Sequence, residues 1–151
     1  MRHVPTPVAI VATTAGGRPV GLTVGSFASV SLEPALVTFF VDQQSTTWPL
    51  MEDSDTFTIN ILGHSKADRC RSFSSKGIDR FAGVDWTASE DGDPILAEAS
   101  VVLECSKHSA RALGDHVQVV GQVQKLHVLS EDLPLVYHQG SFLNLDHLVS
   151  A

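Results

Sequence analysis

Short runs of β-branched, aromatic and other apolar residues, separated by turn residues, recur along this chain and restrict its fold more than any other feature. These β-type runs occupy residues 8–13, 19–24, 36–41, 56–62, 99–106 and 117–129. Gly16-Gly17 predicts a hairpin turn between the first two, and Gly121 predicts a β-bulge in the last. No strand–helix–strand alternation connects the runs. At least six strands with two short helices predict an all-β fold, an antiparallel barrel with short peripheral helices.

Two segments predict the short helices. His64–Phe73 carries Ala67, Cys70 and Phe73 at helical spacing, and Gly77 follows as a stop signal. The second helix is predicted near Trp48, where the hydroxyl residues 45–47 precede Pro49. Those hydroxyls either cap a short helix or leave its N–H groups free to bind an anion, and the local sequence leaves both open.

Length and charge narrow the class of protein. A chain of 151 residues is expected to form one domain, residues 1–151. Its formal net charge of −7 argues against a nucleic-acid partner, which would require a basic surface. No apolar run is long enough for a membrane span, and the N-terminus lacks the profile of a signal peptide. Cys70 and Cys105 lack a paired spacing, so we expect free thiols and a cytoplasmic location.

Several kinds of site are disfavoured by motif. None of the seven histidines stands at metal-ligand spacing from another His, Cys or carboxylate, so we expect no metal. There is no G-x-S-x-G motif of a hydrolase and no G-x-G-x-x-G motif of a Rossmann dinucleotide site.

Three polar segments interrupt the apolar pattern: Thr23–Leu32, Asp42–Thr47 and Ser74–Arg80. The first alternates apolar residues with small hydroxyls, which suits either a flat polar ligand or a serine-rich edge strand. Together the three offer hydroxyls, helix-end N–H groups and two cations, Lys76 and Arg80, a donor set for a phosphate and a planar heterocycle. Both cations could equally be solvated surface charges.

Five segments in this order resemble the flavin reductase family with the FMN-binding split-barrel fold, the reductase components of two-component flavin-dependent monooxygenases. They are A-T-T-A-G-G-R-P-V-G-L-T-V-G-S-F-A-S-V-S-L-E-P (12–34), D-Q-Q-S-T-T-W-P-L (42–50), F-S-S-K-G-I-D-R-F-A-G-V-D-W (73–86), G-D-H (114–116) and Y-H-Q-G (137–140). The resemblance extends from about Val8 to Leu145. It implies hydride transfer from NADH or NADPH to FMN, or to FAD. It also implies a homodimer with the flavin groove near the interface, and reduced flavin passed to a monooxygenase.

The resemblance also assigns residues to the site. It implies that the flavin ring contacts Gly21, Thr23, Gly25 and Ser26, and that the ribityl chain and phosphate contact Asp42, Gln44, Ser45, Thr46, Ser75 and Lys76. His116 would meet the nicotinamide nucleotide as the catalytic-site residue, in a positioning or electrostatic role, with Tyr137 on the same side. No arginine cluster for a 2′-phosphate is evident in the sequence, which favours NADH.

Two departures from the family pattern stand out. Gly25 stands where the family more often has serine, and the usual N-terminal helix before the first strand is missing, which bears on oligomer packing. The alternatives to a reductase are a flavin- or haem-binding split-barrel carrier without turnover, and a structural β-barrel whose polar loops bind nothing.

Overall fold

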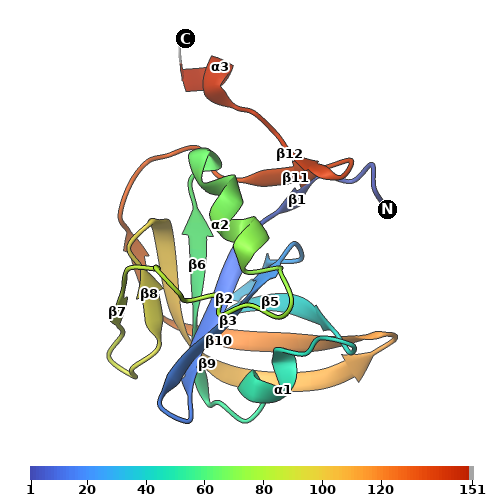
Figure 1. Ribbon diagram of the computed structural model, residues 1–151. Helices are drawn as coiled ribbons and strands as arrows, with labels where there is room; N and C mark the ends of the chain where they lie inside the picture. Colours follow the sequence, from blue (N-terminus) through green and yellow to red (C-terminus); the bar gives the residue numbers. More distant parts are fainter. Residues whose placement is uncertain (150–151) are drawn as a thin grey trace.

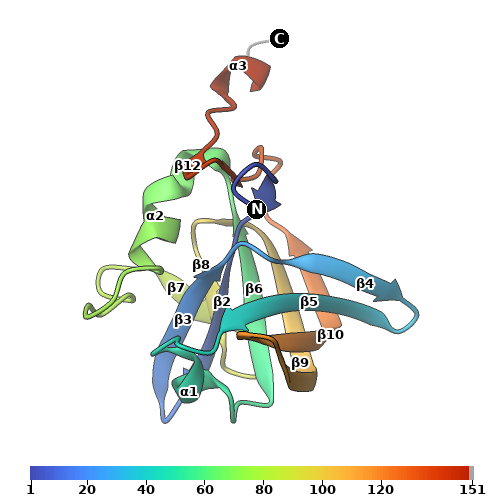
Figure 2. The ribbon, with the colours of Figure 1, turned by 90° about the vertical axis from the view of Figure 1, so that its right-hand side faces the viewer.

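The computed structural model describes residues 1–149. Seven strands form the main sheet: β2 (Ala9–Ala15), β3 (Arg18–Val24), β4 (Ala28–Leu32), β5 (Ala35–Asp42), β6 (Thr56–Leu62), β9 (Ala99–Leu113) and β10 (His116–Val128). Their order is β3-β2-β6-β9-β10-β5-β4, and every neighbouring pair is antiparallel. The sheet curls strongly, so that β3 at one edge contacts β5 near the other (Figure 1 and Figure 2). The prediction of an antiparallel, mostly β fold is confirmed.

Smaller elements complete the fold. They are β1 (Thr6–Pro7), α1 (Trp48–Met51), the 3₁₀ helix η1 (His64–Lys66), α2 (Ala67–Ser72), β7 (Trp86–Ala88), β8 (Pro94–Leu96), β11 (Val136–His138), β12 (Ser141–Phe142) and α3 (Asp146–Val149). β7 pairs with β8, and β1, β11 and β12 form a three-stranded sheet that joins the two ends of the chain. This small sheet lies at one end of the molecule beside α2, whereas α1 lies at the opposite end (Figure 1).

The predicted turns and bulges are confirmed, with one correction to the strands. Gly16 and Gly17 have positive φ and turn the β2–β3 hairpin. The β9–β10 register shifts at Gly121, where an added Cβ would lie only 2.6 Å from Cζ of Phe57. Thr23–Leu32 is not one strand. β3 ends at Val24 and β4 begins at Ala28, so Gly25 to Phe27 lie in the connection between them.

The predicted helices are shorter or less regular than expected. The His64–Phe73 segment begins as a 3₁₀ turn before α2, and Cys70 and Phe73 are buried as the helical spacing predicted. α1 has only four residues: Pro49 lies in its first turn, and the chain turns at Ser54, whose N–H donates to the carbonyl of Met51, before it enters β6. None of the helices within residues 1–149 is long and apolar enough to cross a membrane.

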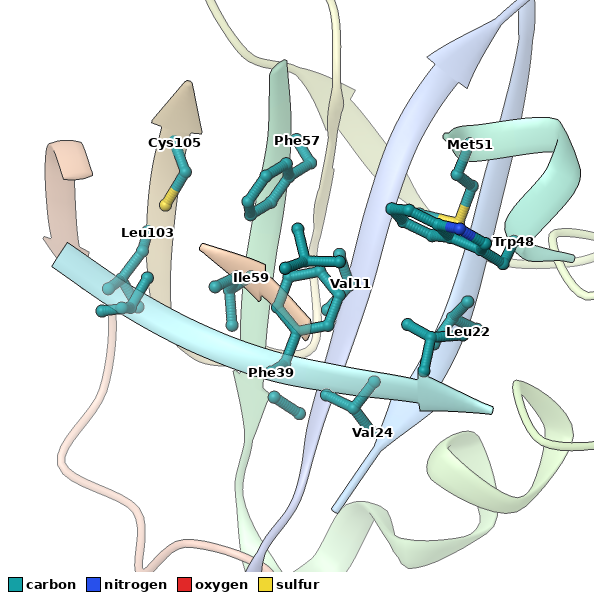
Figure 3. Close-up of a cluster of buried hydrophobic side chains, with 14 residues drawn as sticks. Val11, Leu22, Val24, Phe39, Trp48, Met51, Phe57, Ile59, Leu103 and Cys105 are labelled. Atoms are coloured by element: carbon teal, nitrogen blue, oxygen red, sulfur yellow. The ribbon is translucent and has the colours of Figure 1, made fainter. Parts of the chain in front are cut away.

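The core occupies the concave side of the curled sheet. Figure 3 shows Val11, Leu22, Phe39, Phe57 and Ile59 converging there from four strands. A second cluster lies under α2 and the C-terminal segment, and it includes Phe73 and Leu135. Cys70 and Cys105 are buried free thiols, and burial raises the pKa of each to about 12. The two clusters hold β3 and α2 firmly, and the polar segments lie between these elements.

Candidate flavin site

A groove runs along the face where β3, the end of β5 and the loop after α2 meet. It consists of three adjoining cavities of about 420, 260 and 260 Å³, which we call the tail, central and outer cavities. Thr23 and Ser74 line both the tail and the central cavity. Thr46, Lys76 and Arg80 line both the central and the outer cavity. The fold therefore joins the three polar segments of the sequence into one continuous surface.

The segment after β5 forms a tight polar turn in the central cavity. Asp42 accepts hydrogen bonds from the N–H groups of Gln44 and Ser45, at 2.7 and 2.9 Å. The Ser45 hydroxyl accepts from the N–H groups of Thr47 and Trp48, both at 3.2 Å. Ser45 therefore caps the start of α1, and these N–H groups are not free for an anion. The N–H group and hydroxyl of Thr46, in contrast, have no partner among residues 1–149.

The sequence analysis named Arg80 with Lys76 as a cation of the polar segments, but the residues that the family resemblance assigned to the flavin did not include Arg80. Its Nη1 donates to the carbonyl of Gly21 and to Oγ1 of Thr47, both at 2.9 Å, and its Nε donates to the carbonyl of Ser75 at 2.9 Å. Burial lowers the pKa of the guanidinium. The available signal was its position four residues after Lys76, in the same polar segment of an acidic chain. Arg80 thus fixes a positive charge where the central and outer cavities meet.

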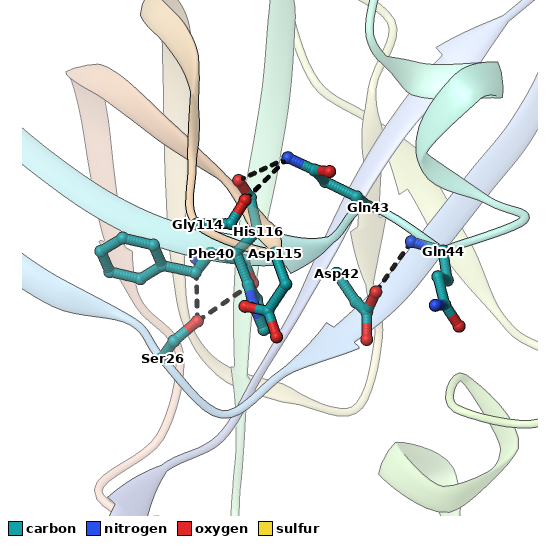
Figure 4. Close-up of polar contacts among 8 residues, drawn as sticks. All are labelled: Ser26, Phe40, Asp42, Gln43, Gln44, Gly114, Asp115 and His116. Atoms are coloured by element: carbon teal, nitrogen blue, oxygen red, sulfur yellow. Dashed lines mark hydrogen bonds and ion pairs between the residues drawn. The ribbon is translucent and has the colours of Figure 1, made fainter.

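The residues assigned to the flavin ring differ in what they offer to a ligand. Thr23 lines the groove, but its hydroxyl donates to the carbonyl of Cys70 at 2.7 Å. The Ser26 hydroxyl accepts from the N–H of Phe40 at 2.8 Å and does not line the three cavities (Figure 4). The main-chain N–H groups of Gly25 and Ser26 have no acceptor in the described part of the chain. Main-chain groups, rather than hydroxyls, are therefore the donors available to a ring here.

His116 and Tyr137 do not meet in one cavity of this chain. His116 begins β10 opposite Asp42, and its Nδ1 lies 2.7 Å from Oδ1 of Asp115, which lowers the pKa of that carboxyl. The Gln43 side chain donates to the carbonyls of Gly114 and His116 and holds this turn against the end of β5 (Figure 4). Tyr137 instead lines the tail cavity. His116 lies outside the lining of all three cavities.

The tail cavity is closed by the small sheet and α2. Tyr137 and Phe142 meet edge to face, with ring centroids 5.4 Å apart. Arg71 of α2 also lines this cavity, with its Cζ 5.0 Å from the centre of the Phe142 ring. The sequence interpretation missed both residues: Phe142 because β12 has only two residues and gives no periodic signal, and Arg71 because it is one more charged residue on α2. Among residues 1–149, no group of three or more His, Cys, Asp or Glu could hold a metal ion.

Comparison with known proteins identifies the family. The sequence profile described as "Flavin reductase like domain" matches residues 1–146. This chain belongs to that family. Its relatives include a flavin reductase of Pseudomonas putida, 40% identical over 139 residues that cover 90% of this chain and 82% of that protein. The reductase subunit HsaB of a flavin-dependent monooxygenase from Rhodococcus jostii is 38% identical over 141 residues, which cover 93% of this chain and 72% of the subunit.

A solved structure agrees with the assignment to the flavin reductase family. The flavin reductase HpaC, crystallised with NADP⁺, superposes with a TM-score of 0.89 at 31% identity, covering 97% of this chain and 94% of that one. The resemblance drawn from the five sequence segments is therefore confirmed. The roles of the individual residues stay predictions.

The chemistry of the groove fits a flavin mononucleotide. Where the central and outer cavities join, Thr46 offers an unpartnered N–H and hydroxyl, and Lys76 has no ion-pair partner within residues 1–149. Nη2 of Arg80 also lacks an acceptor there. Two cations with several free donors are the donor set that a phosphate requires. At the ring end, Thr23 and Gly25 carry no charge, and the unpartnered N–H of Gly25 suits a carbonyl oxygen of a heterocycle.

Proposed function

We propose that this protein is an NAD(P)H:flavin oxidoreductase that reduces FMN and supplies reduced flavin to a partner monooxygenase. The observation that carries the proposal is that Thr46, Lys76 and Arg80 lie together where the central and outer cavities join. Thr23 and Gly25 line the other end of the groove. Phosphate chemistry at one end, and the small uncharged residues Thr23 and Gly25 at the other, match the two ends of FMN. FAD would present the same two features in its flavin half.

In this proposal the residues bind and orient rather than transfer protons. Lys76, Arg80 and Thr46 hold the phosphate, whereas Asp42 and Gln44 line the part of the groove that would hold the ribityl chain. The N–H groups of Gly25 and Ser26 donate to the ring and favour negative charge on it. A bound flavin supplies the hydride acceptor, so the protein's task is to place the nicotinamide at reacting distance.

His116 and Tyr137 lie at different places, so we assign them different roles. Tyr137 supports the nicotinamide nucleotide from within the tail cavity. His116 stands beside Asp42, at the opposite margin, and would reach the nucleotide only from the rim of the central cavity. Its role is therefore positioning or electrostatic. Asp115 and the Gln43 contacts fix the orientation of this turn.

The proposal extends to the fold, the oligomeric state and the cellular location of the protein. We propose a single domain with a split-barrel fold, because β3 approaches β5 but lies beside β2 at the edge of the sheet. β4 is an edge strand that exposes Val30 and Leu32, and we propose that it contacts a second copy of the chain in a homodimer. Two free thiols suit a reducing cytoplasm.

The experiment that tests this function adds FMN and then NADH or NADPH to the purified protein under anaerobic conditions. The protein is expected to bind FMN and to accelerate its reduction by NADH or NADPH. The reduction is followed as loss of the absorbance of oxidised flavin at about 450 nm. Binding without accelerated bleaching by either nucleotide would favour the carrier alternative. No uptake of FMN, FAD or haem would favour the structural barrel.

A further inference from the structure

Two arginines far apart in the sequence lie at the tail cavity, Arg71 in its lining and Arg2 beside it. Arg71 projects from α2 into its lining, beside Phe142 of β12. Arg2 comes from the N-terminus to the border of this lining, since a Cβ added at Gly140 would lie 3.2 Å from Nη2 of Arg2. Gly140 itself lines the cavity. The N–H of Gln139 donates to the carbonyl of Arg2 and fixes the N-terminus against this turn.

The guanidinium of Arg71 is held in place yet remains available. Its Nη1 donates to Asp68 at 2.6 Å, and the Phe142 ring supports its face. Nε and Nη2 have no acceptor in the described part of the chain. The Arg71 side chain is 58% exposed and that of Asp68 97%, so their ion pair is weak and does not compete strongly with a doubly charged ligand.

The hydroxyls around the tail cavity point elsewhere. Ser74 and Ser75 donate to main-chain carbonyls of α2 at 3.1 Å each, and Ser141 donates to the carbonyl of His138 at 3.4 Å. Besides the N–H of Gly25 and the Tyr137 hydroxyl, the two arginines are therefore the donors for an anion at this end of the groove, and they are the ones that carry charge. Arginine matches the geometry of phosphate oxygens with paired N–H groups.

The cavity also has the size and the walls of a nucleotide site. Its volume of about 420 Å³ is in the range of small-ligand sites. Tyr137 and Phe142 provide aromatic surfaces, and Thr23 connects the cavity to the ring end of the flavin groove. A nucleotide seated here would lie next to the flavin ring, where the hydride has to be transferred.

We propose that Arg71 and Arg2 bind a phosphate of the nicotinamide nucleotide in the tail cavity and so determine which nucleotide the enzyme accepts. This inference rests on the proposed function, because it concerns the hydride donor of that reaction. The sequence interpretation favoured NADH since it found no arginine cluster. Folding brings two arginines that the sequence keeps apart to the border of one cavity.

Direct binding of nucleotides tests the inference independently of turnover. Calorimetric titrations of NADP⁺ and NAD⁺ would compare wild type with Arg71→Ala, Arg2→Ala and the conservative Arg71→Lys. Lys125→Ala is the matched control, because it also removes an exposed cation from an ion pair, here with Glu90, and lies outside the groove. Thermal unfolding by circular dichroism would show that each variant folds.

Each alanine variant is expected to weaken nucleotide binding by about tenfold, which corresponds to loss of a hydrogen bond to a charged group, with Arg71→Lys between it and wild type. FMN affinity should stay unchanged. A loss confined to NADP⁺ identifies the 2′-phosphate as the bound group, and an equal loss for NAD⁺ identifies the pyrophosphate. Both outcomes support the inference.

The inference is overturned if Arg71→Ala and Arg2→Ala bind both nucleotides as wild type does, if only FMN affinity falls, or if wild type binds neither nucleotide. Failure of the proposed function gives a different pattern. In that case wild type binds the nucleotides through the arginines but does not accelerate flavin reduction.

Discussion

At the scale of single residues, side-chain direction decides which groups can serve a ligand. The alternation of hydroxyls with apolar residues in Thr23–Leu32 predicted a polar surface for a flat ligand. Folding directs the Thr23 and Ser26 hydroxyls to carbonyl and N–H groups of the protein, and leaves the main-chain N–H groups of Gly25 and Ser26 without an acceptor among residues 1–149. Because those hydrogen bonds join residues distant in the sequence, no local pattern could have predicted them.

Gly21 is predicted to be required for packing, whereas Gly25 is not. A Cβ at Gly21 would lie 3.0 Å from the carbonyl of Val11 and 3.1 Å from Cε1 of Phe73, whereas at Gly25 it would meet only Oγ1 of Thr6 at 3.4 Å. We expect Gly21→Ala to lower the free energy of unfolding by about 1–3 kcal/mol and Gly25→Ala to change it by about 0.5 kcal/mol or less. Urea denaturation measures both. Equal losses in the two variants would contradict this account of Gly21.

At the scale of elements, the sequence predicted what is periodic and missed what is short. Alternation and β-branched runs located the strands of the main sheet except β4, which the sequence merged with β3. The short strands β11 and β12 were missed, since pairs and triplets of residues carry no period. Because β11 and β12 form one wall of the tail cavity, the sequence could not predict that cavity either.

The β9–β10 hairpin gives a prediction at this scale. It turns at Gly114 and Asp115 and presents His116 beside the end of β5. If that turn positions the nicotinamide nucleotide, His116→Ala should raise the KM for the nucleotide several-fold and leave the Kd for FMN within about twofold, a difference below the usual energy of one hydrogen bond. His108→Ala, an exposed histidine on the same hairpin, is the matched control. Identical KM values in the two variants would remove His116 from the site.

At the scale of the whole molecule, the site depends on the long-range closure of the sheet. The five sequence segments predicted the family, and with it the three polar segments that line the groove. They left Arg80 open as either a phosphate ligand or a solvated charge and gave no signal for Arg71, because a surface charge and a site charge look alike until the chain is folded. Nor did they predict that His116 and Tyr137 would lie apart in one chain.

The oligomeric state is a prediction at this scale. Leu32 is 86% exposed on the edge strand β4, which is unusual for a large apolar side chain unless another surface covers it. Sedimentation equilibrium is expected to give twice the mass of one chain. Leu32→Asp should shift the protein toward the monomer, whereas Val4→Asp, at another exposed apolar residue, should not. A wild-type protein that sediments as a monomer would contradict the proposed dimer.

The most direct test of the central claim, that the junction of the central and outer cavities holds the flavin phosphate, compares FMN with riboflavin. The two ligands share the ring and the ribityl chain and differ only in the phosphate. We expect wild type to bind FMN at least about tenfold more tightly, since charge-assisted hydrogen bonds to Lys76 and Arg80 are lost with riboflavin. Lys76→Ala should narrow this difference. Equal dissociation constants for FMN and riboflavin in wild type would contradict the account.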